Sequence, residues 1–278
     1  MDIIHDIPTL RARLARESSI GFVPTMGNLH DGHIALAQQA HLRAQCVVLS
    51  IFVNRLQFGP NEDFDRYPRT FADDCARCEA AGVDVVFAPD ETIMYPVKQD
   101  YTVELPDIQH VLEGKVRPGH FRGVTTVVLK LLNMVQPHIA FFGKKDYQQC
   151  RVLTNMVTQF NVPVELVLMD TVRADDGLAL SSRNRYLSEA ERKEAPALFA
   201  TLNEAKRRLK SGERDHAVIE RDAMFALTSR GWKPDYIAIR RQSDLREPGE
   251  DDKELVILVA ARLGSTRLID NLEVDLLG

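Results

Sequence analysis

The sequence predicts an α/β protein in which a doubly wound parallel sheet is followed by a smaller α+β domain. Over residues 19–169, short apolar runs typical of buried strands alternate with segments whose apolar residues recur at helical spacing. The rest of the chain has two charged helical segments and then three strand-like runs, with a composition shift near residue 187. We therefore predict two domains, residues 1–174 and residues 175–278.

The first domain is predicted to contain six strands connected mainly by helices. Continuous apolar runs such as residues 46–53 are typical of parallel strands that are covered on both faces. The predicted strands cover residues 19–25, 46–53, 83–89, 101–105, 139–143 and 164–169. The predicted helices cover residues 33–45, 70–82, 124–135 and 147–160, with Thr70 and Asp73 placed as a capping box.

The second domain begins at Asp175, and its first residues Asp175, Asp176 and Gly177 together are a hairpin-turn signal. Ser188 and Glu191 form a capping box for a charged helix that is predicted to run to about residue 209. A second helix is expected at about 215–230. Strands are expected at 235–240, 254–264 and 266–274, with the acidic run 247–254 as a solvated turn between two of them.

Composition excludes several classes of function. A chain of 278 residues with 45% hydrophobic and 27% charged residues is ordinary for a globular protein, and its net charge of −5 argues against a nucleic-acid binder. No apolar run is long enough for a membrane span, and the N-terminus does not resemble a secretory signal. We expect a cytoplasmic protein without nucleic-acid or membrane partners. The C-x-x-C at Cys75 and Cys78 lacks a second pair, so ordinary reduced thiols are expected.

Four polar segments follow four of the predicted strands, at residues 24–33, 52–68, 143–149 and 171–187. Ligands of parallel α/β sheets bind in the loops beyond the carboxyl ends of the strands. Chance placement of all four segments at that edge is improbable. The sequence therefore predicts one composite active site formed by these loops.

The segment PTMGNLHDGH, residues 24–33, marks the point where a strand gives way to a helix. The unpaired N–H groups and the dipole of a helix start attract phosphate. His30 and His33 lie on that first turn and can each donate a hydrogen bond or carry positive charge. Gly27 and Gly32 allow a ligand to approach the backbone. The alternative is that one imidazole caps the helix while the other packs in the core.

Cationic and hydroxyl side chains in two other segments also suit phosphate. Lys144 and Lys145 follow a glycine at a strand end and precede Asp146, whose carboxylate suits ribose hydroxyls or hydrated magnesium. The alternative is a solvated, charged loop. The stretch 181–183 places two serine hydroxyls beside an arginine, which is a suitable cradle for nucleotide phosphates. A basic loop at 117–123 is expected to border the same cleft.

Amide side chains at Asn54, Gln57, Gln148 and Gln149 can both donate and accept, which suits a small hydroxylated substrate. The sequence has no G-x-S-x-G elbow, no Walker A motif and no G-x-G-x-x-G after the first strand. These features favour a site that holds negative charge over one that supplies a nucleophile. That is the logic of phosphoryl or nucleotidyl transfer.

The order and spacing of five motifs resemble the pantothenate synthetase (pantoate–β-alanine ligase) family, within the H-x-G-H nucleotidyltransferase superfamily. The motifs are PTMGNLHDGH, FVN-x-x-QFGPNEDFDRYPR, RPGHFRGV-x-TVV-x-KL-x-N, FFG-x-KDYQQ and DGLA-x-SSRNRYL, and together the resemblance covers nearly the whole chain. The resemblance implies a Rossmann-like fold and a two-step ligation of pantoate and β-alanine. ATP is the energy-supplying substrate, Mg²⁺ accompanies it, and a pantoyl adenylate is the intermediate.

The resemblance also implies which residues form the site. His33, His30 and Lys145 are the expected catalytic residues, and Gln57 and Gln149 are expected to hold pantoate, with Gln57 also bordering β-alanine. The expected ATP-binding residues are Met26, Gly27, Asn28, Leu29, His30, Asp31, Gly32, His33, Gly143, Lys144, Lys145, Asp146, Val172, Leu180, Ser181, Ser182 and Arg183. The resemblance names no protein ligands for the metal. It further implies a homodimer whose C-terminal domain acts as a lid.

Two residues depart from the family pattern. Arg55 stands where proline is usual, and Lys144 stands where glutamate is usual, so both change the charge of loops expected near the substrates. Two other functions remain open. One is an H-x-G-H nucleotidyltransferase acting on a phosphate-bearing substrate, which the neutral pair Gln57 and Gln149 argues against. The other is a silent nucleotide-binding or scaffold protein, which the intact His, Lys and Ser-Ser-Arg sets argue against.

Overall fold

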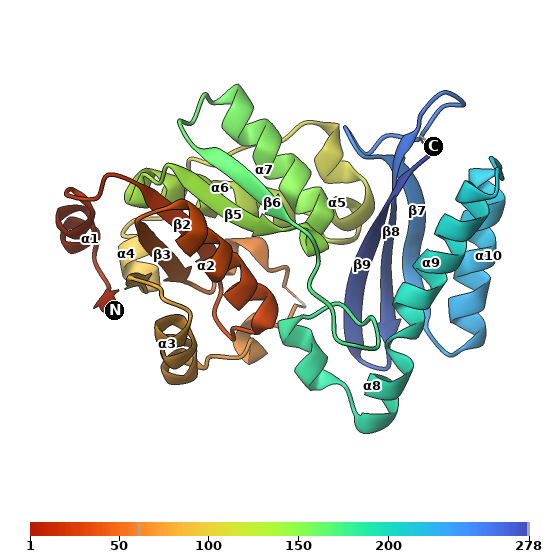
Figure 1. Ribbon diagram of the computed structural model, residues 1–278, viewed down its shortest axis with the longest axis horizontal. Coiled ribbons are helices and arrows are strands. Elements are labelled where there is room, and N and C mark those ends of the chain that lie inside the picture. The colour runs from red at the N-terminus through yellow and green to blue at the C-terminus, as the bar shows by residue number, and fades with distance from the viewer. Residues whose placement is uncertain (61, 277–278) are drawn as a thin grey trace.

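The computed structural model describes residues 1–60 and 62–276, so Asn61 of the second polar segment lies outside the described residues. It contains a six-stranded parallel sheet and a three-stranded antiparallel sheet (Figure 1). The strand order of the parallel sheet is β1-β4-β3-β2-β5-β6. From β2 the chain adds β3 and β4 on one side and then β5 and β6 on the other, so β2 lies at the topological switch point. The predicted α/β class and its doubly wound sheet are confirmed.

The strands of the parallel sheet are short and mostly buried. They are β1 Asp2–Ile4, β2 Ile20–Thr25, β3 Cys46–Ile51, β4 Val85–Phe87, β5 Ile139–Gly143 and β6 Glu165–Met169. The antiparallel sheet is a meander of longer strands, β7 Lys233–Arg241, β8 Glu254–Leu263 and β9 Thr266–Asp275.

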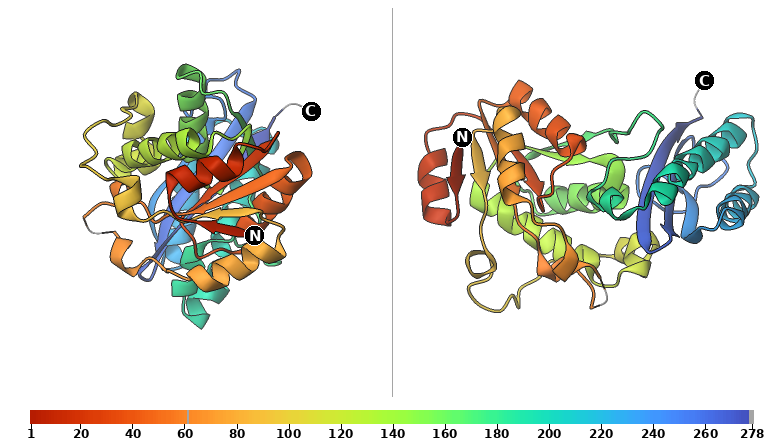
Figure 2. Two further views of the ribbon diagram at one scale, coloured as in Figure 1. Left: turned by 90° about the vertical axis from the view of Figure 1, so that its left-hand side faces the viewer. Right: turned by 90° about the horizontal axis from the view of Figure 1, so that it is seen from below.

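Helices lie on both faces of the parallel sheet, and two long helices cover one face of the antiparallel sheet (Figures 1 and 2). The α-helices are α1 Ile7–Leu14, α2 Asp31–Arg43, α3 Phe71–Ala80, α4 Glu91–Met94, α5 Leu112–Val116, α6 His120–Val135, α7 Tyr147–Gln159, α8 Glu189–Glu194, α9 Ala197–Lys210 and α10 His216–Ser229. The short 3-10 helices are η1 Arg55–Gln57, η2 Phe64–Arg66, η3 Asp107–His110, η4 Lys144–Asp146 and η5 Ser182–Tyr186. No described helix is long and apolar enough to span a membrane.

The sequence predicted six strands in the first domain, but one of them is wrong and another was missed. Residues 101–105 are not a strand, because hydroxyl groups of α6 take their backbone hydrogen bonds. The Val103 N–H donates to Thr126 Oγ1 at 3.1 Å, and Thr125 Oγ1 donates to the Val103 carbonyl at 3.4 Å. The missed strand is β1, which pairs with β4 at the edge of the sheet and buries a single side chain, Ile4.

Helix boundaries differ from the predictions by more than two residues at two places. The helix predicted at 124–135 begins at His120, one turn earlier. The single helix predicted from Ser188 to about residue 209 is two helices, because Pro196 has no N–H to donate and its ring crowds the preceding turn. The capping box of Ser188 and Glu191 is confirmed.

The antiparallel sheet lies against the loops that follow the parallel strands (Figure 1). Asn271 on β9 donates from Nδ2 to the carbonyls of Lys144 and Lys145, at 2.8 and 3.0 Å. Arg267 on the same strand forms a two-pronged ion pair with the buried carboxylate of Glu113, at 2.7 and 2.9 Å. Contacts between residues more than a hundred positions apart therefore place the smaller sheet at the functional edge of the larger one.

Candidate active site

A cleft opens at the carboxyl ends of β2, β3, β5 and β6, where the strand order reverses. All four predicted polar segments contribute to it, and so does Arg117 from the basic loop. The predicted site residues that line it are Met26, His30, Gly32, His33, Gln57, Gly143, Lys145, Asp146, Gln149, Val172, Leu180, Ser181, Ser182 and Arg183. The predicted residues Gly27, Asn28, Leu29, Asp31 and Lys144 are not part of the lining as described.

The two histidines cap the helix α2 and face the cleft together. His30 Nδ1 accepts from the N–H of Gly32 at 3.2 Å, and His33 Nδ1 accepts from the N–H of His30 at 3.3 Å. Their rings lie 4.1 Å apart, centroid to centroid. Since each Nδ1 is an acceptor, the neutral rings carry their protons on Nε2. A Cβ at position 32 would lie 2.9 Å from the His30 ring, so glycine is needed there.

Both imidazoles are neutral near pH 7. Burial lowers the pKa of His30 to about 4, with a further contribution from the charge of Lys145. Burial also lowers the pKa of His33 to about 3, helped by His30 and Lys145. Of the two possibilities that the sequence left open, hydrogen-bond donation therefore holds for the unliganded chain and positive charge does not. The pair is a set of two fixed N–H donors at a helix start.

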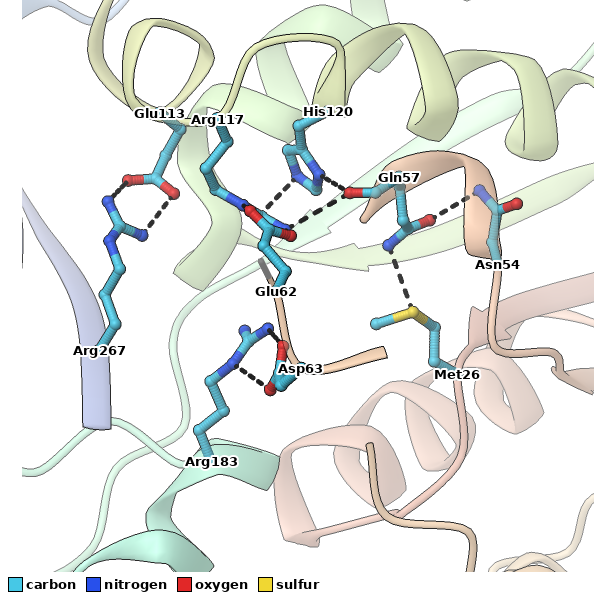
Figure 3. A network of polar contacts seen from close by, with 10 residues as sticks. All are labelled: Met26, Asn54, Gln57, Glu62, Asp63, Glu113, Arg117, His120, Arg183 and Arg267. Atoms are coloured by element: carbon cyan, nitrogen blue, oxygen red, sulfur yellow. Dashed lines mark hydrogen bonds and ion pairs between the residues drawn. The ribbon is translucent and has the colours of Figure 1, made fainter. Parts of the chain in front are cut away.

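Gln57 is held in place from behind by Asn54, which is almost fully buried (Figure 3). Asn54 Nδ2 donates to Gln57 Oε1 at 3.0 Å and to the Gly123 carbonyl at 3.2 Å. Tyr95 in turn donates to Asn54 Oδ1 at 2.7 Å. Gln57 Nε2 points to the sulfur of Met26 at 3.2 Å, a weak acceptor that a substrate oxygen can replace.

The two neighbouring glutamines have different surroundings. Gln149 lines the cleft, whereas Gln148 is 3% exposed and lies outside it. Gln148 accepts from the Glu113 N–H at 3.0 Å and donates to the carbonyls of Ile108 and Val111, at 2.7 and 3.0 Å. The interpretation of Gln148 as a substrate amide is wrong, because its side chain already satisfies backbone groups around α5.

Two arginines of the cleft are paired with consecutive carboxylates of one loop (Figure 3). Arg117 binds Glu62 at 2.6 and 2.7 Å, and Arg183 binds Asp63 at 3.0 and 3.1 Å. His120, predicted only as part of a basic loop, donates from Nδ1 to the Gln57 carbonyl at 2.8 Å and accepts from Arg117. Burial and the charge of Arg117 lower its pKa to about 4, so it too is neutral.

Neither of the two residues that depart from the family pattern lines the cleft. Lys144 pairs with Glu273 at 2.9 Å and with Asp170 at 3.0 Å. Its neighbour Lys145 lines the cleft instead. The guanidinium of Arg55 lies over the ring of Phe64, 3.9 Å from its centroid, and is exposed to solvent. The structure therefore separates the two adjacent lysines, which their side-chain chemistry without the family resemblance does not distinguish.

Asp74 has a role that is not predicted from the sequence. Asp74, on α3, is only 2% exposed and accepts from the N–H groups of Asn28 and Leu29. The predicted capping by Asp73 is wrong, since Thr70 has no side-chain cap and its hydroxyl reaches Asp74. One signal was available: Asp74 lies one helical turn before Cys78, which is fully buried on the same face.

Comparisons with known proteins agree over almost the entire chain. The sequence profile of the family described as pantoate-beta-alanine ligase matches residues 2–273. Curated proteins named pantothenate synthetase from Nitrosospira multiformis and Nitrosomonas europaea are each 56% identical to it. The first alignment covers 99% of this chain and 98% of the relative, and the second covers 98% of both.

Solved structures give the same result. A crystal structure of pantothenate synthetase from Thermus thermophilus matches with a TM-score of 0.93 and 45% identity, over 98% of this chain and 99% of that one. A pantoate-beta-alanine ligase from Francisella tularensis, whose crystal structure contains beta-gamma ATP and beta-alanine, matches with a TM-score of 0.83 and 34% identity, over 98% and 97%. The chain therefore belongs to the pantoate–β-alanine ligase family.

Proposed function

We propose that this protein joins (R)-pantoate to β-alanine in two steps driven by ATP. In the first step a pantoate carboxylate oxygen attacks the α-phosphorus, and the bond to pyrophosphate breaks, which leaves pantoyl adenylate. In the second step the β-alanine amine attacks the acyl carbon, loses a proton and expels AMP. The observation that carries this proposal is the convergence of four strand-end segments on one cleft, in a chain of this family.

The phosphate side of the cleft is formed by α2, Lys145 and the segment 181–183. His30 and His33 present Nε2–H donors to phosphate oxygens, and Lys145 adds a compact positive charge. These fixed donors stabilise the charge that develops on the α-phosphate and on the departing pyrophosphate without reorganising. Bound phosphate would also raise the pKa of both imidazoles, because an anion favours their protonated form. On this proposal His33, His30 and Lys145 are the catalytic residues.

The acyl side of the cleft is formed by Gln57 and Gln149. Neutral amides can bind the hydroxyls and the carboxylate of pantoate without adding charge next to the phosphates. Gln57, held by Asn54, would border β-alanine as well, so that the amine approaches the acyl carbon from that side. This polarity supports a ligase over a nucleotidyltransferase that takes a second phosphate-bearing substrate.

Magnesium is proposed to enter with ATP. Among the described residues no group of three metal-binding side chains exists, which suits an ion held largely by phosphates and water. Asp146, which lines the cleft beside Lys145, would hold its hydrated shell. When bound, the ion would neutralise phosphate charge; orientation of ATP is left to Lys145 and α2.

We also propose that the protein is a cytoplasmic homodimer whose domains divide at residues 174 and 175. The family resemblance supports the dimer. Free thiols at Cys46, Cys75, Cys78 and Cys150 suit a reducing compartment, such as the cytoplasm.

Residues 175–278 would act as a lid that excludes water from the adenylate. Sedimentation analysis at several concentrations tests the dimer; a single monomeric species would contradict it.

The function is tested by measuring AMP release from purified protein. AMP should appear only when pantoate, β-alanine, ATP and Mg²⁺ are all present, in an amount equal to the pantothenate formed. Omitting β-alanine should still allow pantoate-dependent exchange of labelled pyrophosphate into ATP, since the first step is reversible. The proposal fails if the complete mixture yields no AMP, or if ADP and phosphate are formed instead.

A further inference from the structure

Asp74 is a buried carboxylate that lies behind the cleft and not in it. Its Oδ2 accepts from the Asn28 N–H at 2.9 Å and from the Thr70 hydroxyl at 3.2 Å, and its Oδ1 accepts from the Leu29 N–H at 2.8 Å. A carboxylate that is 2% exposed is costly to bury unless its oxygens are hydrogen-bonded. These three donors meet that need, and two of them belong to the loop between β2 and α2.

The loop adopts a conformation that few sequences allow. Gly27 has φ +77° and Asn28 has φ +50°, both in the left-handed region. Successive N–H groups in such a turn point to one side and form a concave site for an anion. Here the anion is the side chain of Asp74, and a Cβ on Gly27 would lie only 3.0 Å from its Oδ2. Asp74 and Gly27 therefore fix the loop together.

Asn28 connects this loop to a second segment of the cleft, the one that carries Ser182. Its carbonyl accepts from the Ser182 hydroxyl at 3.1 Å, and its Nδ2 contacts the Ser182 carbonyl at 3.5 Å. Its Oδ1 accepts from Arg185. Ser182 lines the cleft from the segment 181–183, and His30, two residues after Asn28, lines it from the start of α2. The spacing between the two phosphate-facing walls thus depends on where Asn28 lies.

We propose that Asp74 is a positioning residue for the adenylation step. By fixing the backbone of Asn28 and Leu29, it sets the distance between the imidazole pair and Ser182, and so the width of the space for the ATP phosphates. This inference rests on the proposed function, because it concerns the same reaction. It adds a residue that touches neither ATP nor pantoate and acts through the loop backbone.

The decisive variant is Asp74→Asn. The amide has nearly the same volume, but one acceptor becomes an NH₂ group that opposes a loop N–H. The loop should then shift, and the KM for ATP should rise roughly tenfold or more, as expected for displacements of about an ångström near reacting groups. The KM for β-alanine should change much less, since Asp74 lies on the phosphate side.

Asp84→Asn is the matched control. Asp84 Oδ2 accepts from the Val47 N–H at 2.7 Å, so this variant also removes a carboxylate–backbone bond, but within the sheet and away from the cleft. Loss of folded protein lowers apparent kcat and leaves KM unchanged. The control should therefore melt earlier with the KM for ATP of the original chain. If Asp74→Asn behaves in the same way, Asp74 is merely structural and the inference is overturned.

Arg185→Ala keeps the inference testable if Asp74→Asn does not fold. Arg185 is exposed and does not line the cleft, yet it holds the Asn28 side chain. Its loss should raise the KM for ATP by roughly two- to fivefold at an unchanged melting temperature; an unchanged KM overturns the inference.

Calorimetric measurement of ATP binding to the same variants separates the proposed ligase function from the proposed role of Asp74. If the original chain binds ATP but releases no AMP, the ligase function fails, whereas ATP affinities equal across the variants overturn the role of Asp74.

Discussion

Replacing Gly123 with alanine should disturb the side of the cleft that is proposed to bind pantoate. Gly123 lies in the first turn of α6, against the backbone of the η1 turn that carries Gln57. An added Cβ would lie 2.2 Å from the Leu56 carbonyl oxygen and 2.6 Å from the Gln57 nitrogen. An ordinary contact begins at 3.4 Å, so the turn must move by about 1.2 Å.

Two opposing free-energy terms decide the effect on stability. Alanine favours a helix over glycine by about 1 kcal/mol. Overpacking costs about 1–3 kcal/mol, and the upper end applies because the atoms in the way are backbone and not the end of a flexible side chain. We therefore expect Gly123→Ala to lower the free energy of unfolding by about 1–2 kcal/mol. Displacement of Gln57 should reduce kcat/KM for pantoate by up to about 100-fold.

The assay combines thermal unfolding with AMP release at varied pantoate and fixed ATP. Gly249→Ala is the matched control, since Gly249 lies in an exposed loop whose nearest atom would be at an ordinary 3.7 Å. The control should leave both quantities unchanged. If Gly123→Ala melted like the original chain and retained its kcat/KM for pantoate, the argument that this close approach positions Gln57 would be refuted.

Three further predictions concern Arg267 and the two histidines of the cleft. Arg267→Ala should lower the free energy of unfolding by about 3–5 kcal/mol in chemical denaturation, because it leaves Glu113 buried without a cation; a change below about 1 kcal/mol would contradict this. Burial would raise the pKa of Glu113, but its bonds to Arg267 outweigh that and lower it. The ion pair's contribution to the free energy of unfolding should thus be complete above 4.5, the pKa of Glu113 in the unfolded chain, and should be lost as pH falls through the lowered pKa of the folded chain. The free energies of unfolding of Arg267→Ala and of the original chain should therefore converge in acid. In NMR titrations of the unliganded chain, His30 and His33 should show no midpoint near 6.5. Since only the unfolded state takes up their protons there, stability should fall from about pH 6.5 to about pH 4. His33→Ala should cost about 2–4 kcal/mol of transition-state stabilisation in kcat/KM, and near-normal turnover would refute its role.

Continuous apolar runs made the central strands predictable from sequence. The strand predicted at 139–143 matches β5 residue for residue, because a strand covered on both faces must be apolar throughout. Residues 101–105, YTVEL, also include side chains that favour strands, but among the described residues no strand pairs with them, and Thr125 and Thr126 bind the Val103 backbone instead. The difference lies in which partners the fold brings near, which no local pattern contains.

The same limit applies to the site. The rule that ligands bind beyond the carboxyl ends of parallel strands was enough to bring His30, Gln57, Lys145 and Ser182 into one cleft. Local sequence could not separate Lys145 from Lys144, since the partner that draws Lys144 away is Glu273, on the last strand. Nor could it reveal the pairing of cleft arginines with the loop that follows β3, or the low pKa values that follow from burial.

The most direct test of the account follows the carboxylate oxygens of pantoate. With both oxygens labelled as ¹⁸O, attack on the α-phosphate must leave one labelled oxygen on AMP once β-alanine has displaced it. Mass spectrometry of the AMP from a single turnover should therefore show a gain of one ¹⁸O, with unlabelled pyrophosphate. AMP without label, or label in phosphate or pyrophosphate, would contradict activation of the carboxylate as an adenylate.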